Sequence, residues 1–194
     1  SFNISGVAGV THDIFLQYSL NGGSTWVSDP NISGDVTSIL PGLVYDLTWD
    51  TSMAFPGNQT NVLVRLLTDD NAISPFSDPF DVINTELSQP LVLVVNTGSV
   101  DLGYDLTGVT GITHGIFLEY SVDGGLSWTS STAISGDVTG VLPGAGHTIT
   151  WDTTIDFIGN IPNVRVRLRT DDDALSPESN PFDVINTELS QPLV

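Results

Sequence analysis

Residues 79–92 read PFDVINTELSQPLV, and residues 181–194 repeat this stretch without a change. Shifting the chain against itself by the same 102 positions aligns residues 1–92 with residues 103–194 without a gap, and 56 of the 92 aligned pairs are identical. A gap-free alignment means that every turn keeps its length, so both copies must follow one backbone plan. The sequence therefore predicts two tandem copies of one module.

Apolar and polar residues alternate with a period of two along much of each copy, which predicts β-strands. In the first copy the predicted strands are 1–7, 13–19, 26–28, 44–49, 62–67 and 80–83. In the fifth of these, Leu63 and Leu67 are replaced by arginine in the second copy, which places them on the solvent face. The alternate residues Val62, Val64 and Leu66 are therefore expected to face the core.

One strand of each copy is expected to place a large aromatic side chain in the core. Leu47 and Trp49 are predicted to point inward, as are Ile149 and Trp151 at the same positions of the second copy. Large rings contribute much of the buried apolar area of a small domain.

Six strands are one short of a seven-stranded sandwich, and the segment between the copies supplies the missing strand. This opening strand of the second module is predicted at Pro90, Leu91, Val92, Leu93, Val94 and Val95, and the beginning of another at Gln191, Pro192, Leu193 and Val194. The first module then lacks its opening strand. The predicted division is residues 1–86 and 87–188 for the two sandwiches, with residues 189–194 beginning the opening strand of a next repeat.

Two explanations of this arrangement are open. The chain is a window on a longer covalent array of repeats, or the last segment of one chain completes the open first module of a neighbour by strand donation. In both cases the partners are identical or similar repeats. The mass of the intact native polypeptide separates the two, because a single species near 20.6 kDa excludes the covalent array.

The order of strands, a central Tyr leading into a hairpin and a closing Pro-Phe-Asp-Val strand resemble the fibronectin type III and immunoglobulin-like repeats of bacterial extracellular proteins. The resemblance covers essentially the whole chain and implies an all-β fold of two tandem seven-stranded sandwiches. Residues 121–128 are also similar to the Asp box, Ser-x-Asp-x-Gly-x-Thr/Ser-Trp, and residues 19–26 match it with Asn21 in place of Asp123. The motif is a tight turn with a Trp packed beneath it.

The charge balance excludes whole classes of partner. Four basic residues stand against 23 acidic ones, for a net charge of -19, so nucleic acid and anionic membranes are repelled. The chain has no cysteine, so no disulfide or thiolate metal site holds the fold together. A cysteine-free chain rich in Asp, Thr, Ser and Gly is expected outside the cell or on its surface.

Carboxylates gather in the loop after the fifth strand of each copy, at Asp69 and Asp70 and at Asp171, Asp172 and Asp173. Calcium prefers six to eight oxygen ligands, so these loops are candidate calcium sites, with a solvated turn as the alternative. His12, His114 and His147 lack the neighbours in sequence that catalysis or a zinc site requires. We predict no enzyme.

The sequence thus predicts a structural module of a stalk, filament or surface layer. The alternative is a carbohydrate-binding or adhesive accessory module of a secreted protein, with surface glycans as partners. A glycan array separates the two functions, because a stalk shows no selective binding of sugars.

Overall fold

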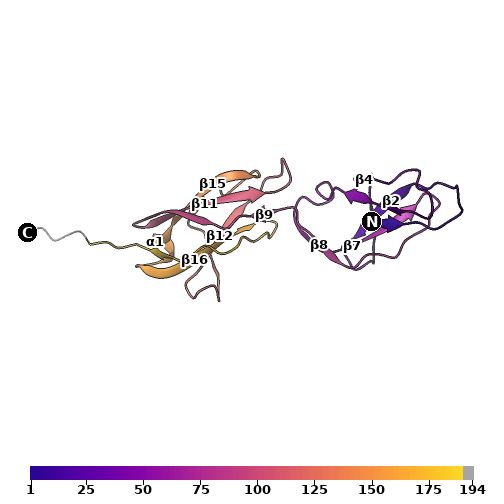
Figure 1. Ribbon diagram of the computed structural model, residues 1–194. Coiled ribbons are helices and arrows are strands. Elements are labelled where there is room, and N and C mark those ends of the chain that lie inside the picture. The colour runs from indigo at the N-terminus through magenta and orange to yellow at the C-terminus, as the bar shows by residue number, and fades with distance from the viewer. Residues whose placement is uncertain (190–194) are drawn as a thin grey trace, which may run out of the picture. The chain divides into compact units, whose positions relative to one another are not determined.

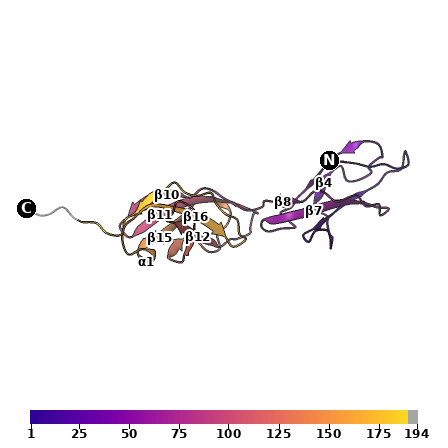
Figure 2. The same ribbon diagram turned by 90° about the horizontal axis from the view of Figure 1, so that it is seen from below.

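We describe the chain from a computed structural model, in which residues 1–189 are described (Figure 1). It divides into two compact units, unit 1 from Ser1 to Asn84 and unit 2 from Thr85 onward. Apart from the single-turn helix α1 (Thr153–Asp156), the regular elements of the described residues are all β-strands, seen from a second side in Figure 2. No helix in this part of the chain has the length and apolar character needed to cross a membrane.

Unit 2 is a sandwich of two antiparallel sheets. One sheet has the order β10-β11-β15-β14, with β9 also paired to β11, and the other has the order β13-β12-β16-β17. The bounds are β9 (Glu86–Leu87), β10 (Leu91–Asn96), β11 (Ser99–Thr107), β12 (Ile116–Ser121), β13 (Thr129–Ser131), β14 (Ile134–Gly136), β15 (Gly144–Asp152), β16 (Ile161–Thr170) and β17 (Phe182–Val184).

The strand order identifies the fold class. An immunoglobulin constant-type sandwich has its first, second, fifth and fourth strands in one sheet and its third, sixth and seventh in the other. Unit 2 follows this order, with β13 added beside the third strand β12. The predicted all-β, immunoglobulin and fibronectin type III-like sandwich is confirmed. The short fourth strand β14 was not predicted, because Ile134, Ser135 and Gly136 contain one apolar side chain and so show no alternation.

The core of unit 2 is closed on both sides. Trp151 is fully buried, stacks on Tyr120 at 5.3 Å between ring centroids and meets Phe157 edge-on at 5.7 Å. Ile149 on the same strand is also fully buried. The inward positions predicted for Ile149 and Trp151 are confirmed.

The opening strand of unit 2 comes in two pieces. β10 lies where the segment between the copies was expected to form a strand, and it pairs antiparallel with β11 with a bulge between Val92 and Val94. β9 pairs further along the same strand β11. Pro90 separates the pieces, because proline has no N–H to donate to a ladder.

Unit 1 repeats this plan with a less complete first sheet. Its four-stranded sheet has the order β3-β2-β7-β8, whereas β1 pairs with β5 and β4 pairs with β6 in separate two-stranded sheets. The bounds are β1 (Phe2–Asn3), β2 (Ile14–Ser19), β3 (Val27–Asp29), β4 (Ile32–Gly34), β5 (Val44–Tyr45), β6 (Leu47–Trp49), β7 (Gln59–Thr68) and β8 (Phe80–Val82).

The core of unit 1 is smaller than that of unit 2. Its main buried cluster consists of Phe55, Val62 and Val82, and Trp49 and Leu47 are only partly buried. Both copies have nearly the same inward-facing residues, so the difference in burial comes from what covers them. The described residues give unit 1 no counterpart of β9 and β10.

One expectation about the outer face needs correction. Leu63 was expected in solvent but is only 6% exposed, because the turn before Trp26 covers it: a Cβ added to Gly23 would lie 3.9 Å from its Cδ1. Trp26 lies partly buried on the same outer face, with the Arg65 guanidinium 4.3 Å from its ring centroid. Trp128 is covered in the same way by an arginine of β16.

One glycine in each copy is required by backbone packing, and this gives a first prediction. Gly136 has a φ of 99°, and a Cβ there would lie 2.6 Å from the carbonyl oxygen of Thr148. Gly136→Ala is therefore expected to destabilise unit 2 by about 2 kcal/mol or more in urea unfolding. Gly140→Ala is the control, since φ is 62° with open space around it, and it should cost about 1 kcal/mol. Equal costs would contradict the steric argument.

Candidate functional site

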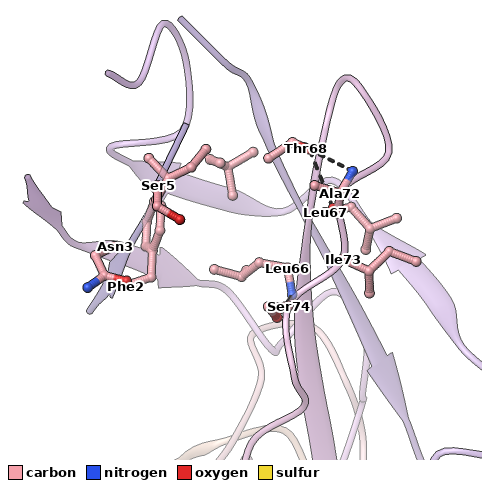
Figure 3. A pocket seen from close by; sticks show the side chains of 11 residues that line it. Phe2, Asn3, Ser5, Leu66, Leu67, Thr68, Ala72, Ile73 and Ser74 are labelled. Carbon is pink, nitrogen blue, oxygen red and sulfur yellow. Dashed lines mark hydrogen bonds between the residues drawn. The ribbon is translucent and has the colours of Figure 1, made fainter. Parts of the chain in front are cut away.

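An apolar groove of about 210 Å³ opens on unit 1 beside β1 (Figure 3). Phe2 and Leu66 lie on opposite sides of this space in Figure 3. Its other lining residues come from the chain after β1, the start of β2, the end of β7 and the loop that follows: Asn3, Ile4, Ser5, Ile14, Leu67, Thr68, Ala72, Ile73 and Ser74. We call this space the β1 groove.

In unit 2 the same position is filled by β9. Leu87 pairs with Leu106 in antiparallel register, and Glu86 pairs with Thr107. Leu87 is 6% exposed and belongs to the buried cluster that includes Leu106 and Leu168. β9 therefore covers this end of the unit 2 core.

The exposed fractions of equivalent residues in the two units show the effect of β9. Three residues that line the β1 groove are exposed or partly buried, whereas their counterparts in unit 2 are at most 4% exposed. The pairs are Ile4 and Leu106, Leu66 and Leu168, and Ala72 and Ala174. Since the loop sequences agree closely, the difference in burial follows from the presence of β9 in unit 2.

The predicted assembly residues fall in two places. Five of those between the copies lie in β10, with Pro90 immediately before it. Gln191, Pro192, Leu193 and Val194 lie outside the described residues. Leu189, the last described residue, is 96% exposed, whereas its repeat counterpart Leu87 is 6% exposed.

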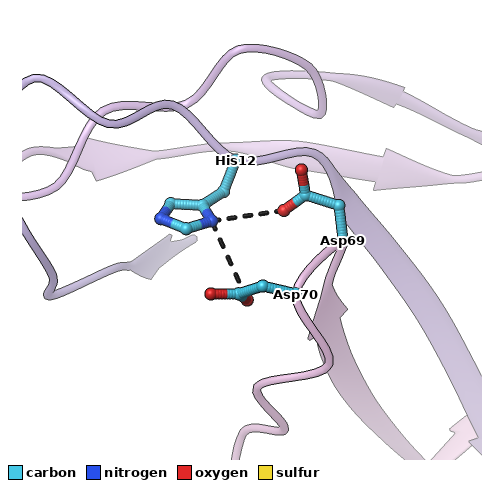
Figure 4. Close-up of side chains that lie close together, drawn as sticks. All are labelled: His12, Asp69 and Asp70. Carbon is cyan, nitrogen blue, oxygen red and sulfur yellow. Dashed lines mark hydrogen bonds and ion pairs between the residues drawn. The ribbon is translucent and has the colours of Figure 1, made fainter.

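A second cluster lies at the carboxylate loop of each unit. In unit 1, His12 Nδ1 lies 3.2 Å from Asp69 Oδ1 and 3.8 Å from Asp70 Oδ1, as Figure 4 shows. In unit 2, His114 Nδ1 lies 3.5 Å from Asp171 Oδ1 and 3.6 Å from the neighbouring carboxylate. His114 is 3% exposed.

Local hydrogen bonds explain the shape of these loops. The Thr68 hydroxyl donates to Asp70 and accepts from the Ala72 N–H, which closes a tight turn. The hydrogen bond from Thr68 is the main cause that lowers the pKa of Asp70. Burial opposes ionisation of Asp172, but hydrogen bonds from Thr170 and Thr85 and the charge of His114 hold its pKa below the usual range.

The loops bring together one imidazole nitrogen and two carboxylate oxygens each. The predicted third carboxylate of unit 2, Asp173, lies apart and pairs with Arg169 at 2.8 Å. Two carboxylates with an imidazole resemble the mixed nitrogen and oxygen sets of zinc sites more than the oxygen cage of calcium. The alternative to a calcium site is a solvated turn, and the hydrogen bonds of Thr68 are those of such a turn.

A third feature is the turn between β12 and β13. The Asp123 carboxylate accepts from the N–H of Ser127 at 3.0 Å and from its hydroxyl at 2.5 Å, and the Ser121 hydroxyl donates to it at 2.7 Å. Trp128 closes the turn, as its Nε1 donates to the Gly125 carbonyl at 3.1 Å. Unit 1 has the same turn with Asn21 in place of the carboxylate.

No family model matches the chain, and no curated protein matches it. Solved structures with some similarity include the domains A168-A170 from titin, at 14% identity and a TM-score of 0.36 over 91% of this chain and 55% of that one. The chicken CNTN1 FN1-FN3 domains give 14% identity and a TM-score of 0.28 over 93% and 55%. A DUF3823 family protein from Bacteroides uniformis gives 12% identity and 0.30 over 91% and 92%.

The chain thus spans about half the length of the titin and CNTN1 fragments. The assignment of the fold rests on the strand order and the core described above.

The hydrogen bonds of Asp123 give a prediction for pH. They lower its pKa in the folded state, so the stability they contribute is present above the unfolded pKa of about 4 and declines as the pH falls below it. Asp123→Asn is expected to destabilise unit 2 at neutral pH, with the difference from the natural chain shrinking below about pH 4. Calorimetry across pH measures this, and Asn21→Asp should introduce the same dependence in unit 1. Parallel pH profiles would contradict it.

Sequence reasoning missed the β1 groove and the pairing of histidine with the carboxylate loops. His12 and His114 stand at equivalent positions, and the Thr-Asp-Asp loop is kept in both copies. The presence of both the histidine and the loop in each copy could have suggested that they interact. The histidine, however, lies 57 residues from its carboxylate partner in the sequence. The groove is visible only when the burial of two equivalent positions is compared.

Proposed function

We propose that this chain is a non-catalytic structural or adhesive repeat of an extracellular array, in a stalk, filament or surface layer. The observation that supports this most is the continuity between the modules. β8 closes the second sheet of unit 1, and three residues later the chain enters β9 and then β10, the opening strands of unit 2. Each module in such a series is completed by the segment that leaves the module before it.

Microscopy of the producing cells tests this function. Antibodies raised against the purified polypeptide should label stalks, filaments or a surface layer on intact cells. Label confined to the cell interior would contradict the proposal. We also propose that the turn at residues 121–128 is an Asp-box-like turn with a structural role and no activity of its own.

Carbohydrate binding is less well supported, because one face of each tryptophan ring is covered. Trp49 and Trp151 stack on tyrosines inside their units, and Trp26 and Trp128 are each covered by an arginine. Sugars bind on open aromatic faces, and these four faces are engaged. Selective binding on a glycan array would favour the accessory-module function instead.

Calcium binding at the carboxylate loops stays a proposal with a simple test. Asp69 and Asp70 supply two carboxylates, so six to eight ligands would require backbone oxygens and water as well. A ligand that binds only the folded state raises the unfolding midpoint. An unfolding midpoint that rises with added calcium and falls again with chelator supports the site. A midpoint that calcium leaves unchanged contradicts it.

A further inference from the structure

We propose that His114, Asp171 and Asp172 of unit 2 form a binding site for a zinc ion. The ligands are Nδ1 of the histidine and one oxygen of each carboxylate. The ion ties the segment before β12 to the loop after β16. This inference goes beyond the proposed structural function and does not depend on it.

The imidazole of His114 is buried and directed at both carboxylates. Its side chain is 3% exposed, and within residues 1–189 its Nε2 has no hydrogen-bond partner. Its Nδ1 lies 3.5 Å from Asp171 Oδ1 and 3.6 Å from Asp172 Oδ1. Both distances exceed the range of about 2.7–3.2 Å for N–H···O hydrogen bonds. A buried ring that faces two carboxylates without a close hydrogen bond to either is the arrangement expected around a bound ion.

The spacing of the three ligand atoms fits a tetrahedral ion. Zinc binds imidazole nitrogen and carboxylate oxygen at about 2.0–2.2 Å, so two of its ligands lie about 3.4 Å apart. The two nitrogen–oxygen distances at His114 are close to this value, and the three ligand atoms all lie within 4.8 Å of one another. Water can take the fourth position, since the side chain of Asp171 is 51% exposed.

Backbone hydrogen bonds place the two segments of the site side by side. The N–H of His114 donates to the Val141 carbonyl at 2.8 Å, and the N–H of Val141 donates back to the His114 carbonyl at 2.9 Å. The N–H of Asp171 donates to the carbonyl of Gly115 at 3.0 Å, which ties the carboxylate loop to the residue after the histidine. The ligands are therefore held near their binding positions, which lowers the cost of ordering them.

The ligand types favour zinc over calcium. Calcium takes six to eight oxygen ligands, whereas imidazole suits zinc and related transition metals. Two carboxylates whose oxygens converge repel each other, and a divalent cation between them removes this repulsion. The same three residue types stand together in unit 1 as His12, Asp69 and Asp70 (Figure 4).

Calorimetric titration with zinc tests the site in the full chain after treatment with chelator. The chain carries Asp69→Asn, which removes one ligand of the unit 1 set so that the titration reports unit 2. We expect one equivalent of zinc to bind. Adding Asp171→Asn should weaken this binding about a hundredfold, because even the loss of a group that only orients a ligand costs about 10–100-fold.

Asp173→Asn is the matched control for Asp171→Asn. It lies in the same loop and removes the same charge, but the Asp173 carboxylate lies apart from the site and pairs with Arg169 at 2.8 Å. It should leave the affinity for zinc unchanged. Equal weakening by the two substitutions would show only the general attraction of cations to a chain of net charge -19, and would overturn the site.

Nitrogen NMR of the histidine rings tests ligation by the imidazole without a substitution in unit 2. Zinc should shift the Nδ1 resonance of His114 and leave that of His147 in place. His147 is the control within the unit, because its Nδ1 lies 3.7 Å from Asp137 and no second carboxylate is recorded beside it in the described residues. Zinc binding that leaves the His114 resonance unchanged would overturn the proposal.

Competition with calcium checks the choice of ion. Zinc should raise the unfolding midpoint of unit 2, because it binds the folded state, and calcium at the same concentration should not displace it. Displacement by calcium, or no binding of zinc at all, would overturn the inference. Neither outcome bears on the proposed structural function, which the labelling of intact cells tests separately.

Discussion

Trp151→Ala is expected to destabilise unit 2 by about 3–5 kcal/mol, the range for removing a large aromatic ring from a closed core. Trp151 is fully buried, and its Nε1 donates to Asp156 Oδ2 at 2.7 Å. The substitution removes the stacking on Tyr120 and leaves a cavity that closed surroundings cannot fill. Urea unfolding followed by circular dichroism measures the loss.

Trp49→Ala is the internal control, because Trp49 occupies the same position in unit 1. It makes the same kinds of contact, with Tyr18 at 5.6 Å and a hydrogen bond to Asp29 at 2.9 Å, but it is only partly buried. Less apolar area is lost and water enters the space, so we expect about 1–2 kcal/mol. Equal costs for the two substitutions would contradict the open core of unit 1.

The architecture could be predicted because it depends on local signals. Alternation in residues 62–67 and the repeat of residues 79–92 are enough to place strands and to find the opening strand of the second module. β4 and β14 were missed because their sequence, Ile-Ser-Gly in both copies, has a single apolar side chain and a glycine and so shows no alternation. Leu63 was misplaced because an exchange with arginine was taken as a sign of solvent, whereas the turn beside Gly23 covers the leucine.

The candidate site could not be predicted for a different reason. Leu66 and Leu168 are the same residue in nearly the same sequence, yet only Leu168 is fully buried. Leu168 belongs to the same buried cluster as Leu87, which precedes the second copy in the chain. Burial at these positions depends on a segment that belongs to the preceding copy, so the sequence of one copy alone cannot show it.

The largest stabilising effect is expected when unit 1 receives an opening strand of its own. Adding a copy of residues 83–102 before Ser1 supplies the counterparts of β9, β10 and the first half of β11. In unit 2 these elements contribute the buried side chains Leu87, Val100 and Leu102. Burial of these aliphatic side chains and the added main-chain hydrogen bonds oppose the entropy cost of ordering the extension, and we expect a net stabilisation of unit 1 because the same elements are ordered in unit 2.

Calorimetry of the extended chain should show the transition of unit 1 at higher temperature and that of unit 2 unchanged. The control carries the same extension with glutamate at the two positions that copy Leu87 and Leu102, which keeps its length but removes its apolar contacts. In the extended chain Trp49→Ala should also become as costly as Trp151→Ala, because the core around Trp49 is now closed. If the extension leaves unit 1 unchanged, the β1 groove is not a vacant strand position, and the lower burial of unit 1 must arise from its own sequence differences.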